Sequence, residues 1–108
     1  MPDLDEVLLA LAHPARREAL KMLGEGREIC LCEFIDRLGV AQPNMSRHMS
    51  VLRRVELVVD RRDARWVRYR LNDAAAADLK AILETVLSAH AQATAVTSSS
   101  SNNREAAE

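Results

Sequence analysis

The spacing of apolar residues changes once along this chain, and that change restricts the folds open to it. Up to Leu57, apolar residues recur three and four positions apart, as on amphipathic helices. Residues 58–62 and 66–71 then alternate between two faces, as hairpin strands do, with residues 63–65 as the turn. Helical spacing returns over residues 73–93. The sequence therefore predicts several helices, one short hairpin and a last helix.

Four helices are expected before the hairpin. The first begins near Asp3 or Asp5, and Pro14 fits the first turn of the second. The third helix runs to Leu38, with Gly39 as its C-terminal cap. Their predicted inward faces are Leu4, Val7, Leu8 and Leu11, then Ala15, Ala19, Leu20 and Leu23, and then Leu31, Phe34, Ile35 and Leu38.

The fourth helix follows Gly39 after a very short connection, so helices three and four form a helix-turn-helix unit. Its inward side carries Met45, Met49 and Leu52. The other side has polar groups suited to reading base edges and phosphates. The candidate DNA-binding residues on this helix are Gln42, Asn44, Ser46, Arg47, His48, Ser50 and Arg54. For His48, a packed or phosphate-bonded histidine is a close alternative.

The charge of the chain is unevenly distributed. The net charge is −1, yet residues 47–70 contain eight arginines and three acidic residues, which gives +5. A basic block in an acidic chain is typical of a nucleic-acid surface, although a solvated arginine-rich face is the plain alternative. A basic hairpin directly after a recognition helix is a wing, and Arg61, Arg62 and Arg65 are its candidate DNA contacts.

These features predict a winged helix-turn-helix protein, mainly α with a small β-hairpin, in the order α-α-α-α-β-β-α. The domain is expected over residues 1–93, with 94–108 as a disordered tail rich in serine and asparagine. The apolar stripe of the last helix is long for the edge of so small a domain, so the first and last helices are expected to form a homodimer interface. The alternative is a last helix folded back on its own core.

Several classes of protein are not expected. No apolar run approaches the roughly 20 residues of a membrane span, and the acidic N-terminus is unlike a signal peptide, so a cytoplasmic protein is expected. The sequence has no Gly-rich phosphate loop, no nucleophile with a plausible base and no clustered carboxylates. An enzyme is therefore not expected.

Five segments of this chain resemble the ArsR/SmtB metalloregulatory repressors, and among them the arsenical resistance operon repressors. The segments follow one another in the same order as in that family. They are LALAHPAR at 9–16, EICLCE at 28–33, AQPNMSRHM at 41–49, LVVDRR at 57–62 and RWVRYRL at 65–71. The resemblance extends over roughly residues 5–90. It implies a homodimer on double-stranded operator DNA, with the fourth helix in the major groove, the wing on the backbone, and release when a metalloid binds.

Cys30 and Cys32 are the only cysteines. A bridge across one intervening residue would be strained and the cytoplasm is reducing, so no structural disulfide is expected. Thiolates are soft donors and select soft ions. On a regular helix, residues i and i+2 point about 200° apart. Binding one ion through both sulfurs would therefore distort the helix start and shift the protein away from its DNA-competent state.

The resemblance points to the same pair as the metal site for trivalent arsenic, As(III). Many relatives have a third cysteine where Ile35 stands, so the third ligand stays open: glutathione, water or hydroxide, or a residue of the tail. A two-sulfur site also suits methylarsenite, and antimonite, Sb(III), is chemically close. The alternative function is a thiol redox-sensing repressor that uses the same two cysteines.

The resemblance also argues against zinc. Zinc sensors of this family have an Asp/His set on the last helix, whereas this chain has only His90 there, with Asp73 and Asp78 at the wrong offsets. No zinc site is expected on that helix. His13 is expected to start a helix and not to bind metal.

Two positions depart from the family pattern in ways that bear on stability. Ala41 stands where Ser or Thr usually caps the recognition helix, a loss of about 1 kcal/mol. Glu56 replaces a glycine that commonly ends that helix in left-handed geometry, so strain or a different helix end is expected.

Overall fold

The computed structural model describes residues 1–24 and 26–99, with side chains as far as residue 93. Its elements are α1 (Leu4–Leu11), α2 (Pro14–Leu23), β1 (Ile29–Cys30), α3 (Leu31–Leu38), α4 (Gln42–Arg54), β2 (Val58–Asp63), β3 (Trp66–Leu71) and α5 (Ala77–Ser99). The strands form one antiparallel sheet in the order β1-β3-β2. This confirms the predicted helices and hairpin and adds β1, which the sequence analysis did not anticipate.

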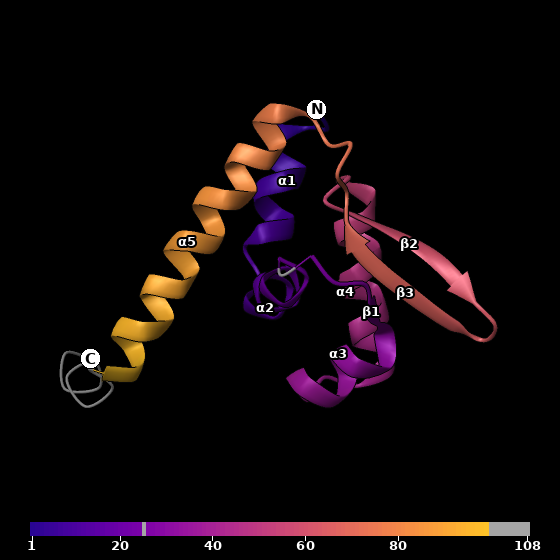
Figure 1. The fold of residues 1–108 in the computed structure, drawn as a ribbon. Helices are drawn as coiled ribbons and strands as arrows, with labels where there is room; N and C mark the ends of the chain where they lie inside the picture. The colour runs from indigo at the N-terminus through magenta and orange to yellow at the C-terminus, as the bar shows by residue number, and fades with distance from the viewer. Residues whose placement is uncertain (25, 100–108) are drawn as a thin grey trace.

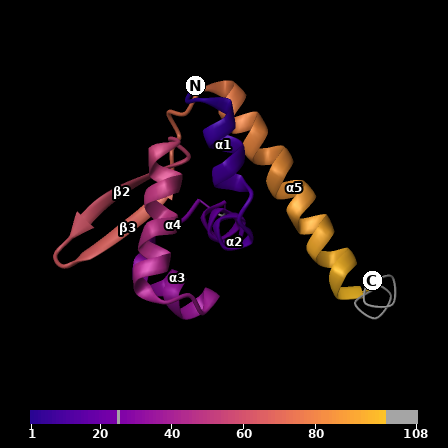
Figure 2. The same ribbon diagram turned by 180° about the vertical axis from the view of Figure 1, so that it is seen from behind.

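The hairpin of β2 and β3 projects from the helical body on the side opposite α5, and α4 lies beside its base (Figures 1 and 2). The recognition helix and the wing therefore share one side of the molecule. Helix α5 runs obliquely alongside α1 on the other side.

Local capping explains where the first helices begin. The Asp3 carboxylate accepts a hydrogen bond from the Glu6 backbone N–H (3.2 Å) and caps α1. His13 Nδ1 accepts from the Ala15 N–H (3.2 Å) and caps α2, with Pro14 as its first residue. His13 is thus a helix-start residue, as predicted.

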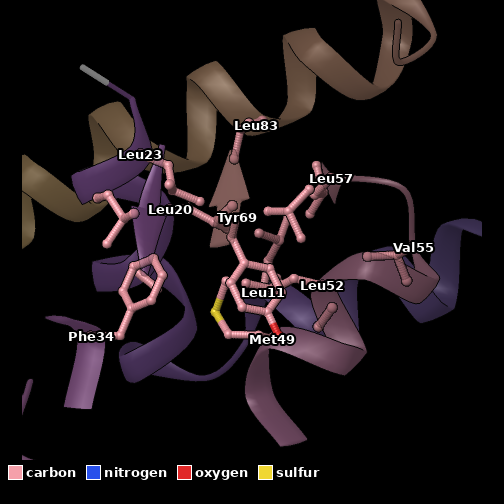
Figure 3. Packing of buried hydrophobic residues seen from close by; sticks show 14 of the residues in the cluster. Leu11, Leu20, Leu23, Phe34, Met49, Leu52, Val55, Leu57, Tyr69 and Leu83 are labelled. Atoms are coloured by element: carbon pink, nitrogen blue, oxygen red, sulfur yellow. The ribbon is translucent and has the colours of Figure 1, made fainter. Parts of the chain in front are cut away.

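The core lies where the helices meet the inner face of the sheet (Figure 3). Phe34 of α3 packs edge-on against Tyr69 of β3, with ring centroids 6.3 Å apart. The predicted inward stripe of α4, Met45, Met49 and Leu52, is fully buried. With few aromatic side chains available, the core is built from aliphatic and methionine side chains around this one pair.

The first and last helices are only partly used by this core. Val7 and Leu11 of α1 are buried, but Leu4 and Leu8 of the same predicted stripe are 48% and 49% exposed, and Leu9 is 69% exposed. On α5, Leu79 and Leu83 are buried, whereas Ile82, Val86 and Leu87 are only partly covered. The last helix therefore folds back on the core of its own chain through Leu79 and Leu83. Its remaining apolar residues form a second edge that the domain covers only in part.

Helix α5 differs from expectation at both ends. It begins at Ala77 and not at Asp73, because Asn72 forms a turn in which its side-chain oxygen accepts from the Ala74 N–H (3.1 Å). It continues to Ser99, so the start of the expected disordered tail is helical. The rest of that tail, 100–108, lies outside the described residues. Among the residues that are described, no helix has the length and apolar character of a membrane span.

Candidate nucleic-acid interface and cysteine pair

The outward face of α4 presents most of the predicted DNA-binding residues together. Gln42, Asn44, Arg47 and Arg54 are exposed, and Ser46 and Ser50 are half-buried at its edges. Arg47 donates from Nη1 to the Asn44 side-chain oxygen at 3.0 Å. This contact holds two candidate base-reading groups against each other one turn apart.

His48 lies differently from the other predicted DNA-binding residues of α4. It is half-buried against α2, where its Nδ1 accepts from Arg16 Nε (3.2 Å) and its ring lies 4.3 Å from that of His13. Burial, and then the charges of His13, Arg16 and Arg47, lower the pKa of His48. In this structure His48 is therefore a packed histidine, which was one of the alternatives to a DNA contact.

The three predicted DNA-binding residues of the wing do not behave alike. Arg62 and Arg65 are exposed, near the tip of the hairpin. Arg61 instead donates two hydrogen bonds, from Nε and Nη2, to the two carboxylate oxygens of Glu28, each 2.7 Å long. This bidentate pair joins β2 to the residue just before β1.

Four of the eight arginines in residues 47–70 have a carboxylate partner. Besides Arg61, they are Arg53 with Asp60 (3.9 Å), Arg68 with Asp63 (2.9 Å) and Arg70 with Asp73 (3.9 Å). Within the described ranges 1–24 and 26–99, no ion pair forms at Arg47, Arg54, Arg62 or Arg65. The uncompensated positive charge is thus divided between α4 and the wing tip.

Both ends of α4 match the sequence expectations. Ala41 occupies the N-cap position without a side-chain hydrogen bond. At the other end, Glu56 adopts a left-handed conformation (φ 65°), and the Leu57 N–H bonds to the Leu52 carbonyl (3.1 Å). This is the geometry that glycine usually supplies at a helix end.

Cys30 and Cys32 lie at the junction of β1 and α3. Cys30 is extended, ends β1 and caps α3, where its sulfur accepts from the Cys32 backbone N–H (3.2 Å). The two residues form a disulfide, with Cα atoms 5.2 Å apart. Cys30 is buried and Cys32 is exposed.

Two expectations about this pair were therefore wrong. A bridge was not expected, and the sulfurs were expected on opposite flanks of a helical turn. The physical reason is that α3 begins at Leu31, so Cys30 precedes the helix and the rotation of 100° per residue does not separate the two side chains. The sulfurs meet without any distortion of the helix.

The sheet connects the cysteine pair to the wing. Cys30 pairs with Arg68 of β3, and Arg68 pairs in turn with Arg61 of β2. The three residues form one row across the sheet. In the described part of the chain, no three His, Cys, Asp or Glu side chains gather as a metal-binding group. Ile35, where the family resemblance led us to look for a third cysteine, is half-buried.

His90 of α5 has partners within the chain at both ring nitrogens. Its Nε2 lies 2.6 Å from a carboxylate oxygen of Glu18, and its Nδ1 accepts from Arg17 Nε (3.1 Å). Since both partners belong to α2, His90 joins the first part of the domain to the last helix.

A helix-turn-helix followed directly by an arginine-bearing hairpin defines a winged helix-turn-helix DNA-binding regulator. Residues 13–59 match the family described as "Bacterial regulatory protein, arsR family". The arsenic resistance transcriptional regulator ArsR2 of Pseudomonas putida is 33% identical over 87 residues, which are 81% of this chain and 76% of that protein. The chain therefore belongs to the ArsR family of bacterial regulatory proteins.

Two further comparisons agree. The arsenical resistance operon repressor of Escherichia coli is 39% identical over 62 residues, 57% of this chain and 53% of that protein, so the match spans about half its length. The crystal structure of the transcriptional repressor BigR from Xylella fastidiosa is 34% identical with a TM-score of 0.61, over 80% of this chain and 84% of that one. These proteins are regulators of transcription and not enzymes.

Proposed function

We propose that this chain is a transcriptional repressor that binds operator DNA and is released when trivalent arsenic or antimony binds at Cys30 and Cys32. The observation that carries the proposal is the meeting of the two sulfurs at the β1–α3 junction. Relatives named for arsenic and arsenical resistance support the class of inducer.

The donor chemistry of the pair fits this ligand in part. Once the disulfide is reduced to two thiols, two thiolate sulfurs suit a soft centre, and the N-terminus of α3 favours negative charge on the Cys30 sulfur. Trivalent arsenic would supply a three-coordinate centre, of which these residues fill two positions. Because Cys32 is exposed, a small molecule from solution can reach the third position. Methylarsenite needs only the two sulfurs.

The position of the cysteine pair explains how a ligand bound to it would change the DNA-binding side of the molecule. Cys30 belongs both to the sheet, through its pairing with Arg68, and to the cap of α3. Helix α3 leads through Gly39 directly into α4. A change in the geometry of Cys30 therefore acts on the wing and on the helix-turn-helix unit together, and requires no unwinding of α3.

On DNA, we place α4 in the major groove and the wing on the backbone. The polar side chains of Gln42, Asn44 and Arg47 are suited to base edges, while the unpaired Arg62 and Arg65 are suited to phosphates. We place Arg54, Ser46 and Ser50 beside the DNA backbone that flanks the groove. These assignments are part of the proposal.

We also propose that the repressor is a homodimer formed through α1 and α5. Leu4, Leu8 and Leu9 expose large apolar surfaces on α1, which soluble domains usually cover. A groove beside them is lined mainly by apolar residues, with Arg17 and His90 as its polar members: Leu8, Leu11, Ala12, Arg17, Val86, Ala89, His90 and Ala93. A second copy would cover this surface and would place two α4 helices on an inverted repeat.

The test is the fluorescence anisotropy of a labelled duplex that this protein has selected from a random library. Arsenite, methylarsenite, antimonite, zinc, cadmium and peroxide are titrated separately into the complex of the protein whose two cysteines have been reduced. We expect release by trivalent arsenic and antimony and none by zinc. Failure of every arsenic and antimony species to release the DNA would contradict the proposed inducer.

The disulfide between Cys30 and Cys32 favours a second candidate, a redox-sensing repressor. In that case peroxide would oxidise the two thiols to the disulfide and would be reduced to two molecules of water. Release by peroxide alone, reversed by dithiothreitol, would establish this function in place of arsenic sensing.

A further inference from the structure

The arginines of the wing fall into two groups by their contacts. Arg62 and Arg65 are exposed and, in the described part of the chain, form no ion pair. Arg61 is also exposed, but one edge of its guanidinium, which carries Nε and Nη2, donates two hydrogen bonds of 2.7 Å to the Glu28 carboxylate. Sequence position alone would give all three the same role.

We propose that Arg61 is a positioning residue, which sets the position of the wing through Glu28, and that Arg62 and Arg65 make the wing's phosphate contacts. This inference rests on the DNA-binding part of the proposed function and is independent of the inducer.

The geometry shows why this pair can hold the wing. Glu28 immediately precedes β1, which has two residues and, in the described part of the chain, pairs with β3 alone. Arg61 belongs to β2, the far strand of the sheet. The side-chain pair therefore spans the sheet from β1 to β2. It adds a contact between the helical body and the outer strand that the backbone hydrogen bonds do not provide.

A phosphate contact through the Nε–Nη2 edge of Arg61 would have to compete with this pair. Bidentate arginine–carboxylate pairs are among the stronger protein hydrogen bonds and are directionally specific. The hydrogen bond from Arg61 lowers the pKa of Glu28, so Glu28 stays ionised and keeps its hold on Arg61 at neutral pH. Binding a phosphate through the same guanidinium edge would leave the Glu28 carboxylate beside the DNA backbone without its partner.

The two roles predict opposite effects of Glu28→Gln. If Arg61 only positions the wing, losing the carboxylate loosens the wing and weakens DNA binding. If Arg61 is a phosphate contact restrained by Glu28, the same change frees a cation, removes a negative charge, and strengthens binding. The dependence of the affinity on salt separates the cases further, since each phosphate contact contributes about −0.9 to the slope of log K against log salt.

The experiment measures the affinity of the full chain for the selected duplex at several salt concentrations. For Glu28→Gln and Arg61→Met we expect about tenfold weaker binding with an unchanged slope, and the double variant should be no worse than either. Arg62→Met and Arg65→Met should weaken binding and each lower the slope by about one.

Asp73→Asn is the matched charge control, because Asp73 is 94% exposed and 3.9 Å from Arg70. Its affinity should stay within about threefold of wild type or tighten.

Arg61→Lys covers the case in which the Glu28 variant fails to fold. Lysine keeps the charge but cannot form the bidentate pair, so a positioning role predicts the loss seen with methionine and a phosphate role predicts retained affinity. Tighter binding by Glu28→Gln, retained affinity in Arg61→Lys, a slope lowered by Arg61→Met, or no effect of any Glu28 or Arg61 variant would each overturn the inference. Absence of sequence-selective binding by the wild-type chain would overturn it together with the proposed DNA-binding function.

Discussion

The side-chain amide of Asn72 donates a hydrogen bond to the main-chain carbonyl oxygen of Glu56, at 3.0 Å. Glu56 is the left-handed residue that ends α4, and Asn72 directly follows β3. The end of the recognition helix is thus held by the end of the wing. This contact supports a backbone conformation that a glutamate does not favour by itself.

Replacing Glu56 with glycine should therefore stabilise the fold by about 1 kcal/mol, because glycine adopts the left-handed region without the Cβ penalty. Urea denaturation followed by circular dichroism would measure the gain. Glu56→Ala is the matched control, since it removes the carboxylate and keeps the Cβ. An equal gain in the alanine variant would attribute the effect to charge and contradict the proposed strain.

A side-chain oxygen at position 41 should also raise stability. Ala41 caps α4 without a hydrogen bond, and a threonine there can accept one from the first turn, which is worth about 1 kcal/mol. Ala41→Val has the same shape without the oxygen and should give no gain. Equal unfolding free energies for the threonine and valine variants would show that no cap forms.

Replacing Cys30 or Cys32 with serine should leave DNA affinity intact and abolish release by arsenite. A hydroxyl is a hard donor that binds arsenic poorly, yet serine at position 30 can still cap α3. Anisotropy of the labelled duplex at increasing arsenite concentration would show the loss. Release that persists in both single variants would place the inducer elsewhere on the chain.

Arg47→Ala should weaken DNA binding about tenfold or more without changing arsenite affinity. Arg47 is exposed on the outward face of α4 and is remote in sequence from the cysteine pair. Lys80→Ala, which removes an exposed cation from α5, serves as the control and should bind DNA like wild type. Unchanged DNA affinity in Arg47→Ala would mean that another face of α4 meets the DNA.

His48 should make stability depend on pH. Its pKa is lowered from the ordinary 6.5, first by burial and then by the charges of His13, Arg16 and Arg47. As pH falls, the unfolded chain therefore takes up this proton first. The contribution of neutral His48 is fully present above about pH 6.5 and is lost as pH falls through the folded pKa.

The His48→Gln variant isolates that contribution. The amide oxygen of glutamine can still accept from Arg16 but does not titrate. Unfolding free energies at pH 7.5 and 5.5 should fall less in the variant than in wild type. Parallel losses in the two proteins would assign the pH dependence to other groups.

Much of this molecule follows from local patterns in the sequence. The stripe of Met45, Met49 and Leu52 faces inward because helical spacing alone places these residues on one side of α4. The missing cap at Ala41 was predictable because it concerns a residue and its immediate neighbours in a helix. For Glu56 the sequence left two outcomes open, strain or a different helix end, and the structure has the left-handed conformation. The wing followed from a change of period and a short turn.

Other features were decided only by the tertiary structure. Strand β1 is two residues long, and it forms because β3 lies beside it. That pairing keeps Cys30 extended, so α3 begins at Leu31 and Cys30 lies outside the helix. The two sulfurs can therefore meet. The sequence suggested a helical position for Cys30 because helical spacing continues back to Leu31 and nothing local marks so short a strand.

The same distinction separates the arginines of the wing. Sequence composition determined that the region after α4 is basic, but Arg61 meets Glu28 across 33 positions of the chain, and His48 meets Arg16 across 32. Such pairs depend on which elements pack together and at what register, and no local spacing encodes them. The sequence therefore determined the class of the fold and its basic surface, whereas the packing of distant elements decided which of the described arginines pair with a carboxylate of the protein and which do not.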